Sequence, residues 1–172
     1  HQFNVLVEKG TEKPFQNKYY DNREKGIYIC AACSNKLFDS EDKFKSGSGW
    51  PSFSDVIDEE AVGTRKDNSL RTTRTEVYCN RCGGHLGHVF EDGPEPTGLR
   101  YCMNSGALNF LKSAHLALGC FWGPDAVFGS LEGVYFTETG YAGGNMDNLT
   151  YHNLGQHTET VLVNYDPEVI NI

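Results

Sequence analysis

Cys79-Asn80-Arg81-Cys82 repeats the pattern of Cys30-Ala31-Ala32-Cys33, and residues 34–78 separate the two CxxC pairs. Each pair places two thiolates close enough to bind one tetrahedral ion, and two such pairs brought together make a closed four-cysteine site that is typical of zinc. In the alternative, one pair is a redox motif of the thioredoxin type, but that motif opens a helix in a parallel βαβ unit, whereas these flanks have the pattern of strands and turns. The sequence therefore predicts a structural zinc ion, without which the first half of the chain would unfold, with these ligands: Cys30, Cys33, Cys79 and Cys82.

The segments on either side of the pairs have the composition of strands. The apolar run 27–29 follows a turn signal at Lys25-Gly26 and leads directly into Cys30. From Leu70 to Tyr78, residues alternate in a way that suits an antiparallel strand with one solvated face. We therefore expect the region around the cysteines to be mainly β.

Composition and charge narrow the classes of function. The chain has 172 residues, which is enough for one domain with a sizeable core or for two small ones. A formal net charge of −8 argues against a nucleic-acid partner, because binding phosphates requires a basic patch. No apolar run approaches the roughly 18 residues of a membrane-spanning helix. No nucleotide or flavin motif occurs either, so we expect no membrane partner and no organic cofactor.

Cysteine usage and the first residue bear on location. Six cysteines, four of them in CxxC pairs, are too few for a disulfide scaffold and favour metal binding in a reducing compartment. We therefore expect a cytoplasmic protein. Because the chain begins with His1 rather than Met, we expect it to be processed or trimmed, which leaves a removed targeting segment open.

The segment from His85 to Asn104, HLGHVFEDGPEPTGLRYCMN, gathers the groups of a candidate active site. A free cysteine such as Cys102 is usually a small buried hydrophobe. Here, however, Arg100 and two histidines are close to it in sequence, and cations lower the pKa of a thiol toward neutrality and favour the nucleophilic thiolate. His85 and His88 are alternative zinc ligands, but four cysteines already fill a tetrahedral shell, so we interpret them as hydrogen-bond donors or general acids.

A second feature is the glycine-rich stretch SGSGWPSF at 46–53, which contains Trp50. A lone tryptophan is more often a core or surface aromatic than a ligand contact. Loops carry function more often than they carry core, which favours a pocket position for Trp50.

The first 112 residues contain several long motifs in order: Gly10-Thr11-Glu12, both CxxC pairs, SGSGWPSF at 46–53, RTEVYC at 74–79, HLGHVFEDGP at 85–94 and RYCMNS at 100–105. With these motifs, residues 2–112 resemble methionine sulfoxide reductase B over their whole length. The resemblance implies a zinc-stapled domain of two small antiparallel sheets that reduces the R epimer of methionine sulfoxide, free or in proteins. It makes Cys102 the nucleophile, places Trp50 and Phe90 against the substrate, and assigns the shaping and protonation of the site to His85, His88, Asp92, Arg100 and Asn104.

The chemistry of that family raises the question of recycling. A thiolate attacks the sulfoxide sulfur only if the oxygen can leave protonated, and the attacking cysteine is left as a sulfenic acid that condenses with a second thiol. Many members of the family carry a resolving cysteine where this chain has Ser48, and a serine cannot form that disulfide. We therefore expect Cys120, or an external thiol from a thioredoxin-like protein or a small molecule, to complete the cycle.

A second segment begins near Leu116. The apolar run 116–123 predicts a short strand that ends in a turn, followed by a helix from Asp125 to Leu131. Cys120 at this junction is either a buried turn cysteine or a thiol activated by the positive end of the helix.

Several motifs occur in order after residue 116: GCFWG at 119–123, GYAGG at 140–144, Leu149-Thr150-Tyr151, HTETV at 157–161 and YDPEVI at 165–170. With these motifs, residues 116–170 resemble the N-terminal part of methionine sulfoxide reductase A, an α/β or α+β enzyme specific for the S epimer. The resemblance makes Cys120 the nucleophile and Glu159 the proton donor, and forms the substrate pocket from Phe121, Trp122 and Tyr151.

We therefore expect a fused reductase with a B-type domain at 1–112, a short junction at 113–115 and a truncated A-type domain at 116–172. The A family continues with a C-terminal part that supplies an aspartate and a tyrosine, so we expect reduction of the S epimer in a longer fusion. Two other functions are weaker, because neither explains Cys102 with its polar neighbours. One is a non-catalytic zinc-knuckle module that binds peptides through Trp50. The other is a zinc hydrolase, which needs an open metal position that four cysteines do not leave.

Overall fold

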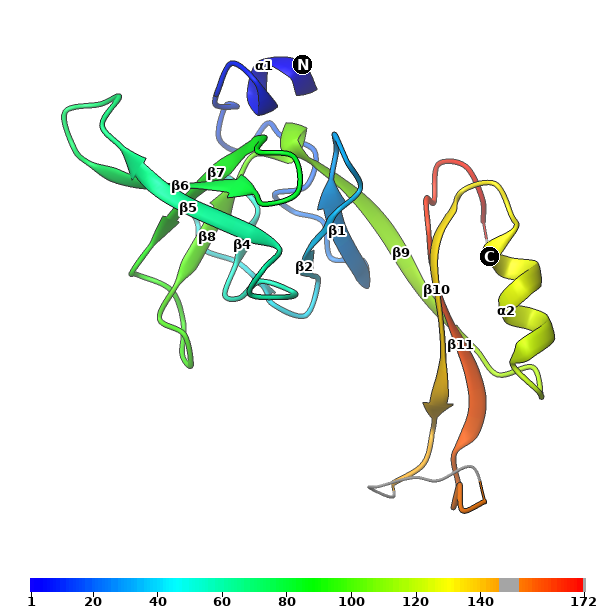
Figure 1. Ribbon diagram of the computed structural model, residues 1–172. Coiled ribbons are helices and arrows are strands. Elements are labelled where there is room, and N and C mark those ends of the chain that lie inside the picture. The colour runs from blue at the N-terminus through cyan, green and yellow to red at the C-terminus, as the bar shows by residue number, and fades with distance from the viewer. Residues whose placement is uncertain (146–151, 172) are drawn as a thin grey trace. The chain divides into compact units, whose positions relative to one another are not determined.

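The computed structural model describes residues 1–145 and 152–171. It divides into two compact units, His1–Phe110 and Leu111–Ile172 (Figure 1). Among the described residues, no helix combines the length and the hydrophobicity needed to cross a lipid bilayer.

The first unit is mainly β, as the sequence predicts. A short helix, α1 (Gln2–Leu6), precedes two antiparallel sheets, and a 3-10 turn, η1 (Ser105–Ala107), follows them. The smaller sheet pairs β1 (Gly26–Cys30) with β2 (Lys36–Asp39), so the expected strand does end at the first cysteine. The six-stranded sheet has the spatial order β3 (Lys43–Phe44), β4 (Ser52–Phe53), β8 (Arg100–Met103), β7 (His85–Phe90), β6 (Arg74–Cys79) and β5 (Val62–Asp67).

An aromatic cluster forms the centre of this unit. Phe38 and Phe53 are fully buried and stack with their ring centroids 4.4 Å apart. Tyr28, also fully buried, meets Phe53 edge-on at 5.0 Å. Since Phe53 belongs to β4 and Phe38 to β2, these contacts join the two sheets around one core.

Both CxxC pairs adopt the same turn. The backbone N–H of Ser34 donates to the carbonyl of Cys30 at 2.9 Å, and that of Gly83 donates to the carbonyl of Cys79 at 2.7 Å. The residue after each second cysteine has a left-handed backbone, with φ of 59° at Ser34 and 76° at Gly83. Glycine adopts this conformation without strain, which explains the residue at 83.

The second unit is an antiparallel sheet with one helix. Strand β9 (Leu108–Leu116) begins in the first unit and continues into the second, where it pairs with β11 (Thr158–Tyr165), which in turn pairs with β10 (Val134–Ala142). Helix α2 (Trp122–Gly129) packs on β10 and β11. A small core lies here, formed by Phe121, Val161, Val163 and Tyr165.

The strand, turn and helix expected in this unit occur in that order, but with shifted bounds. The strand already ends at Leu116, where the expected one begins, and the chain turns at Gly119, where φ is 85°. The helix begins at Trp122 rather than at Asp125 and ends at Gly129 rather than at Leu131. Pro124 therefore lies in the first helical turn, where the missing N–H of proline costs no hydrogen bond.

Candidate active site

The four cysteines of the CxxC pairs come together as predicted. Their sulfur atoms all lie within 4.8 Å of one another. The closest pairs join one knuckle to the other: Cys30 Sγ is 3.7 Å from Cys82 Sγ, and Cys33 Sγ is 3.6 Å from Cys79 Sγ. These separations far exceed the roughly 2.05 Å of a disulfide bond. The cluster has the donor set and the closed arrangement of a structural metal site.

The candidate active site lies on one face of the six-stranded sheet. In an antiparallel sheet, residues directly opposite each other on neighbouring strands point to the same side. Cys102 on β8 is opposite both Ser52 on β4 and His88 on β7. The same row continues from His88 to Glu76 on β6 and from Glu76 to Arg65 on β5.

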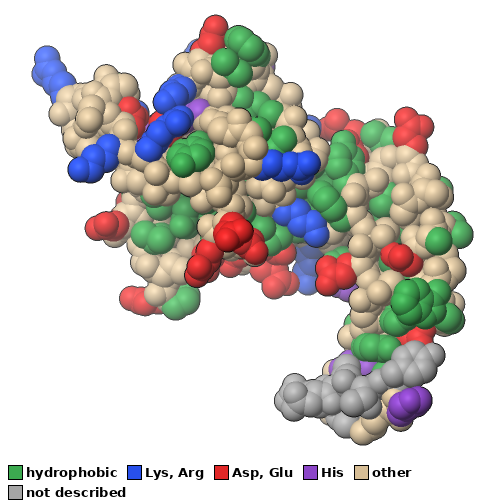
Figure 2. All heavy atoms as spheres, viewed as in Figure 1, with side chains coloured by type: hydrophobic (Ala, Val, Ile, Leu, Met, Phe, Trp, Pro, Cys, Tyr) green, Lys and Arg blue, Asp and Glu red, His purple; other side chains and the backbone are tan. Residues whose placement is uncertain are grey.

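A second row lies two residues along the strands on the same face, because side chains alternate with a period of two. In this row Arg100 is opposite Phe90, and Arg74 is opposite Asp67. The register of β5 to β8 thus places acidic, basic and aromatic side chains beside Cys102. On the visible face of the first unit, Figure 2 shows several basic side chains close to a histidine.

A bulge in β7 brings the two histidines together. Tyr78 is opposite His85 but Val77 is opposite Gly87, so Leu86 is an extra residue in the strand. In a regular strand, positions three apart face opposite sides, and one extra residue restores them to the same side. The imidazole rings of His85 and His88 are accordingly 5.5 Å apart.

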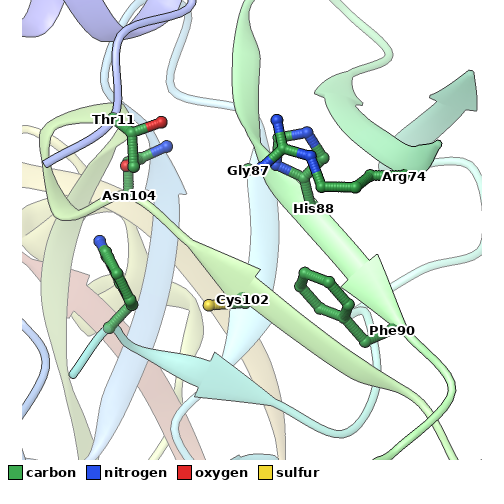
Figure 3. Close-up of a pocket in the computed structure, with 8 residues that line it drawn as sticks. Thr11, Arg74, Gly87, His88, Phe90, Cys102 and Asn104 are labelled. Carbon is green, nitrogen blue, oxygen red and sulfur yellow. The ribbon is translucent and has the colours of Figure 1, made fainter. Parts of the chain in front are cut away.

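A pocket opens over this face. It contains Cys102, Trp50, Phe90, His88 and Asn104 from the predicted set, and adds three residues that sequence reasoning had not assigned: Thr11, Arg74 and Gly87. Figure 3 shows Thr11 and Asn104 on one side of the Cys102 sulfur, with His88, Arg74 and Phe90 on the other. Thr11 and Arg74 belong to motifs that the family resemblance already contains, and that was the available signal.

Hydroxyl groups surround the Cys102 sulfur on the side of β4. Ser48 Oγ is 3.8 Å from Cys102 Sγ, and Ser46 Oγ lies 2.8 Å from both Ser48 Oγ and Ser52 Oγ. Burial raises the pKa of Cys102, and the Ser48 hydroxyl and the positive charge of Arg100 offset part of that rise. The expected lowering of the Cys102 pKa toward neutrality is therefore not found, because the effect of burial exceeds that of the Arg100 charge.

Arg100 and Asp92 support the pocket from its edge rather than line it. The guanidinium of Arg100 donates to Asp92 through Nε at 2.8 Å and through Nη2 at 2.9 Å. It also lies 4.5 Å from the centre of the Phe90 ring, a cation–π distance. Arg100 therefore fixes Phe90 and brings positive charge near the thiol.

His85 lies behind the pocket and does not line it. Its side chain is 3% exposed, and Nδ1 is 2.8 Å from Glu76 Oε1. Burial lowers the pKa of His85, and Glu76 opposes that effect. Glu76 also accepts hydrogen bonds from Arg65 at 2.7 and 2.8 Å and from Lys9 at 3.0 Å. These partners, Arg65 first, hold the pKa of Glu76 down to about 2, so it is a buried carboxylate anion.

The N-terminal segment positions Trp50 and Asn104. Trp50 Nε1 donates to the carbonyl of Glu12 at 3.1 Å, and the backbone N–H of Glu12 donates to Asn104 Oδ1 at 3.2 Å. The Glu12 carboxylate accepts the backbone N–H of Gly106 at 3.1 Å. Trp50 is therefore a pocket residue whose ring is anchored by residues distant in sequence.

The structure describes all the predicted site residues of the second unit except Tyr151. Cys120 is exposed, which excludes the buried-turn interpretation, and Trp122 is 69% exposed. Phe121 is buried, and its backbone N–H donates to Glu159 Oε2 at 3.0 Å. Tyr151 lies outside the described residues. A pocket elsewhere in this unit contains none of these side chains and is lined by His115, Glu138, Thr139, Gly140, Tyr141, Ala142, Thr160 and Leu162.

Two protein-family models match this chain, each over a different part. The family model described as SelR domain matches residues 1–112, and the one described as Peptide methionine sulfoxide reductase matches residues 112–172. Peptide methionine sulfoxide reductase MsrB of Methanosarcina mazei is 61% identical over 111 residues, which are 64% of this chain and 79% of that protein. The protein of the same name from Leptospira interrogans is 54% identical over 111 residues, 64% of this chain and 85% of the relative. Methionine-R-sulfoxide reductase B3, mitochondrial, of Mus musculus is 52% identical over 109 residues, 63% of this chain and 43% of that protein. The chain therefore belongs to the SelR domain family.

Proposed function

We propose that the first unit reduces the R epimer of methionine sulfoxide, free or in proteins, with Cys102 as the nucleophile. The observation that carries this proposal is the position of Cys102 in the wall of a pocket, directly opposite His88 and beside Trp50 and Phe90. The name of the mouse relative supports the choice of epimer.

The reaction transfers one oxygen atom and two electrons. The Cys102 sulfur attacks the sulfoxide sulfur, the sulfur–oxygen bond of the substrate breaks, and the oxygen ends on Cys102 as a sulfenic acid. The sulfoxide sulfur gains the two electrons that the cysteine sulfur loses. The thiol proton ends on the sulfenic oxygen, so methionine leaves neutral and no other reactant is consumed.

Each neighbouring side chain has a role in this step. His88, in the pocket and opposite Cys102, is the proton-transfer group. Trp50 and Phe90 enclose the methyl and methylene groups of the substrate, and Asn104 completes the polar wall. Arg100, held by Asp92, offsets part of the cost of forming a buried thiolate. His85 acts from behind the pocket through its contact with the ring of His88.

An external thiol completes the cycle. Ser48 Oγ lies 3.8 Å from the Cys102 sulfur, and a hydroxyl cannot form a disulfide with the sulfenic acid. Two equivalents of a small thiol, or one dithiol of the thioredoxin type, return Cys102 to the thiol, releasing one water and one disulfide.

Zinc is the metal that fits the four-cysteine cluster. A zinc–sulfur distance of about 2.3 Å places the sulfur atoms of a tetrahedron about 3.8 Å apart. The shortest sulfur separations in the cluster, 3.6 and 3.7 Å, match that edge. Cys30, Cys33, Cys79 and Cys82 would hold the ion as a structural staple, and four thiolates leave it no open position for substrate.

We assign residues 1–112 to the R-specific domain, 113–115 to a junction and 116–172 to part of an S-specific domain. Cys120 would be the nucleophile of that second domain, with Glu159 as proton donor and Phe121, Trp122 and Tyr151 around the substrate. The hydrogen bond from the Phe121 backbone to Glu159 supports the proximity of Glu159 to Cys120.

Stereospecific turnover tests these assignments. R and S epimers of a methionine sulfoxide peptide are incubated with dithiothreitol and wild type, Cys102→Ser or Cys120→Ser protein. R-epimer turnover should vanish in Cys102→Ser and persist in Cys120→Ser. Turnover of the S epimer that depends on Cys120 would establish the second activity. Absence of all turnover in the wild type would leave a peptide-binding module as the better description.

A further inference from the structure

The orientation of His88 is set from outside the pocket. Its Nε2 lies 2.7 Å from Asp67 Oδ2, at the end of β5. Because a carboxylate only accepts hydrogen bonds, Nε2 must carry the hydrogen in this contact. Nδ1 is then the nitrogen left to act toward Cys102, which is opposite His88 in the strand register.

Asp67 is itself held in place by other groups. Its Oδ1 accepts the backbone N–H of Ser69 at 2.9 Å, and its Oδ2 also accepts Arg74 Nη2 at 2.8 Å. Hydrogen bonds from Ser69, then from His88 and Arg74, hold the pKa of Asp67 well below its usual range. The aspartate is therefore a fixed anion on the β5–β6 hairpin.

No competing carboxylate takes over this contact on the six-stranded sheet as described. Glu76, which is opposite His88 on β6, has its oxygens occupied by Lys9, Arg65 and His85. The other titratable or charged groups around His88 are His85, whose ring it meets edge-on, and Arg74 and Cys102 in the pocket. Asp67 is thus the anion that defines the tautomer of His88.

We propose that Asp67 is a positioning residue for proton transfer at Cys102: it keeps the hydrogen of neutral His88 on Nε2 and leaves the lone pair of Nδ1 facing the pocket. The inference rests on the proposed function. In it, Nδ1 accepts the proton of the Cys102 thiol as the sulfur attacks, and returns that proton to the oxygen as the sulfur–oxygen bond of the substrate breaks. The balance of atoms and electrons is that of the overall reaction, with His88 unchanged at its end.

Asparagine at this position removes the anion that fixes the tautomer. The amide NH2 of Asp67→Asn meets another donor in either orientation, Arg74 on one side or the N–H of Ser69 on the other. The contact then no longer requires hydrogen on Nε2, and neutral His88 can place its hydrogen on Nδ1, which removes the acceptor from the pocket.

A matched control is available in Asp58. Its Oδ1 accepts the backbone N–H of Glu60 at 2.7 Å, the same two-residue turn that Asp67 makes with Ser69. Asp58 is exposed, and the hydrogen bond of its carboxylate goes to the backbone of Glu60 rather than to a histidine. Asp58→Asn therefore changes an equivalent turn without touching the pocket.

The first test is spectroscopic. Long-range 15N–1H NMR spectra of the full chain, at a pH high enough to make His88 neutral, distinguish the two tautomers, and His88→Gln identifies the resonance. We expect hydrogen on Nε2 in the wild type and in Asp58→Asn, and a larger share of the tautomer with hydrogen on Nδ1 in Asp67→Asn. A wild-type His88 with its hydrogen on Nδ1 would overturn the inference, whatever the variants do.

The second test is kinetic. Asp67→Asn should lower kcat for the R epimer by at least about tenfold, a part of the roughly 10²–10⁴-fold that a proton-transfer group contributes, with KM within about twofold. Asp58→Asn should match the wild type, and Asp67→Glu should recover part of the loss. An unchanged kcat in Asp67→Asn, or an equal loss in Asp58→Asn, refutes the positioning role while the proposed function stands. If the wild type itself fails to reduce the R epimer, it is the proposed function that is refuted.

Discussion

Replacing Glu76 by glutamine should destabilise the first unit by about 2–3 kcal/mol at neutral pH. The carboxylate is 3% exposed and bonded to Arg65, Lys9 and His85. Its pKa falls from 4.5 to about 2, and each unit corresponds to about 1.4 kcal/mol, which gives roughly 3 kcal/mol. Arg65 and Lys9 are 45% and 52% exposed, so solvent screening lowers the estimate toward 2 kcal/mol.

The pH dependence of this loss has a definite sign. A carboxyl group with a depressed pKa stabilises the fold fully above its unfolded pKa, here 4.5, and loses that contribution as pH falls toward about 2. The difference between wild type and Glu76→Gln should therefore be constant at pH values above about 5.5 and shrink in acid.

Urea unfolding with saturating zinc measures this difference, and the midpoint should fall by about 1 M. The exposed Glu59→Gln is the control and should not move the midpoint. A loss below about 1 kcal/mol, or a difference that titrates near neutrality, would refute the electrostatic account of Glu76.

Three further changes test the site and the core. Gly87→Ala should abolish R-epimer turnover, because the added Cβ would clash with the carbonyl oxygen of Cys102, and circular dichroism should show whether the sheet survives. Ser48→Cys should reduce one equivalent of sulfoxide without added thiol and form a disulfide between positions 48 and 102, because Ser48 Oγ lies 3.8 Å from Cys102 Sγ. Mass spectrometry would detect the loss of two hydrogens from the protein, and a stable sulfenic acid on Cys102 would contradict the prediction. Phe53→Ala should cost about 3–5 kcal/mol in urea unfolding, because Phe53 is fully buried and stacked on Phe38, and a loss below about 1 kcal/mol would mean that the core refills the space.

The sequence predicts the parts of this protein that depend on local chemistry. Two CxxC pairs indicate a metal site without any knowledge of how the intervening residues fold, and the four sulfur atoms do lie within 4.8 Å of one another. Alternation predicts a strand at residues 70–78; β6 covers Arg74–Cys79, and residues 70–73 lie outside it. The family motifs contain most of the pocket, including residues such as Thr11 to which no role was given.

What the sequence does not reveal depends on cross-strand register. Asp67 and Glu76 look like ordinary charges on an amphipathic hairpin, and only the pairing of β5, β6 and β7 makes them partners of His88 and His85. The direction of the Cys102 pKa shift was misjudged, because the residues adjacent in sequence do not reveal how deeply the thiol is buried. In the second unit, the end of the strand and the start of the helix were misplaced, because an apolar run does not distinguish a strand from a turn and the start of a helix.

The bulge at Leu86 has a consequence for how this strand can be edited. The alternation of side chains between the two faces of β7 is interrupted at Leu86, so odd-numbered positions before it face the side that even-numbered positions face after it. Removing that one residue would leave His85 opposite Tyr78 and on the same face as His88, because the two histidines would then be two positions apart in a regular strand; the loss would be the buried side chain of Leu86. The three-residue spacing of the two histidines therefore depends on the bulge. The same motif grafted onto a regular strand would place the two imidazole rings on opposite faces of the sheet.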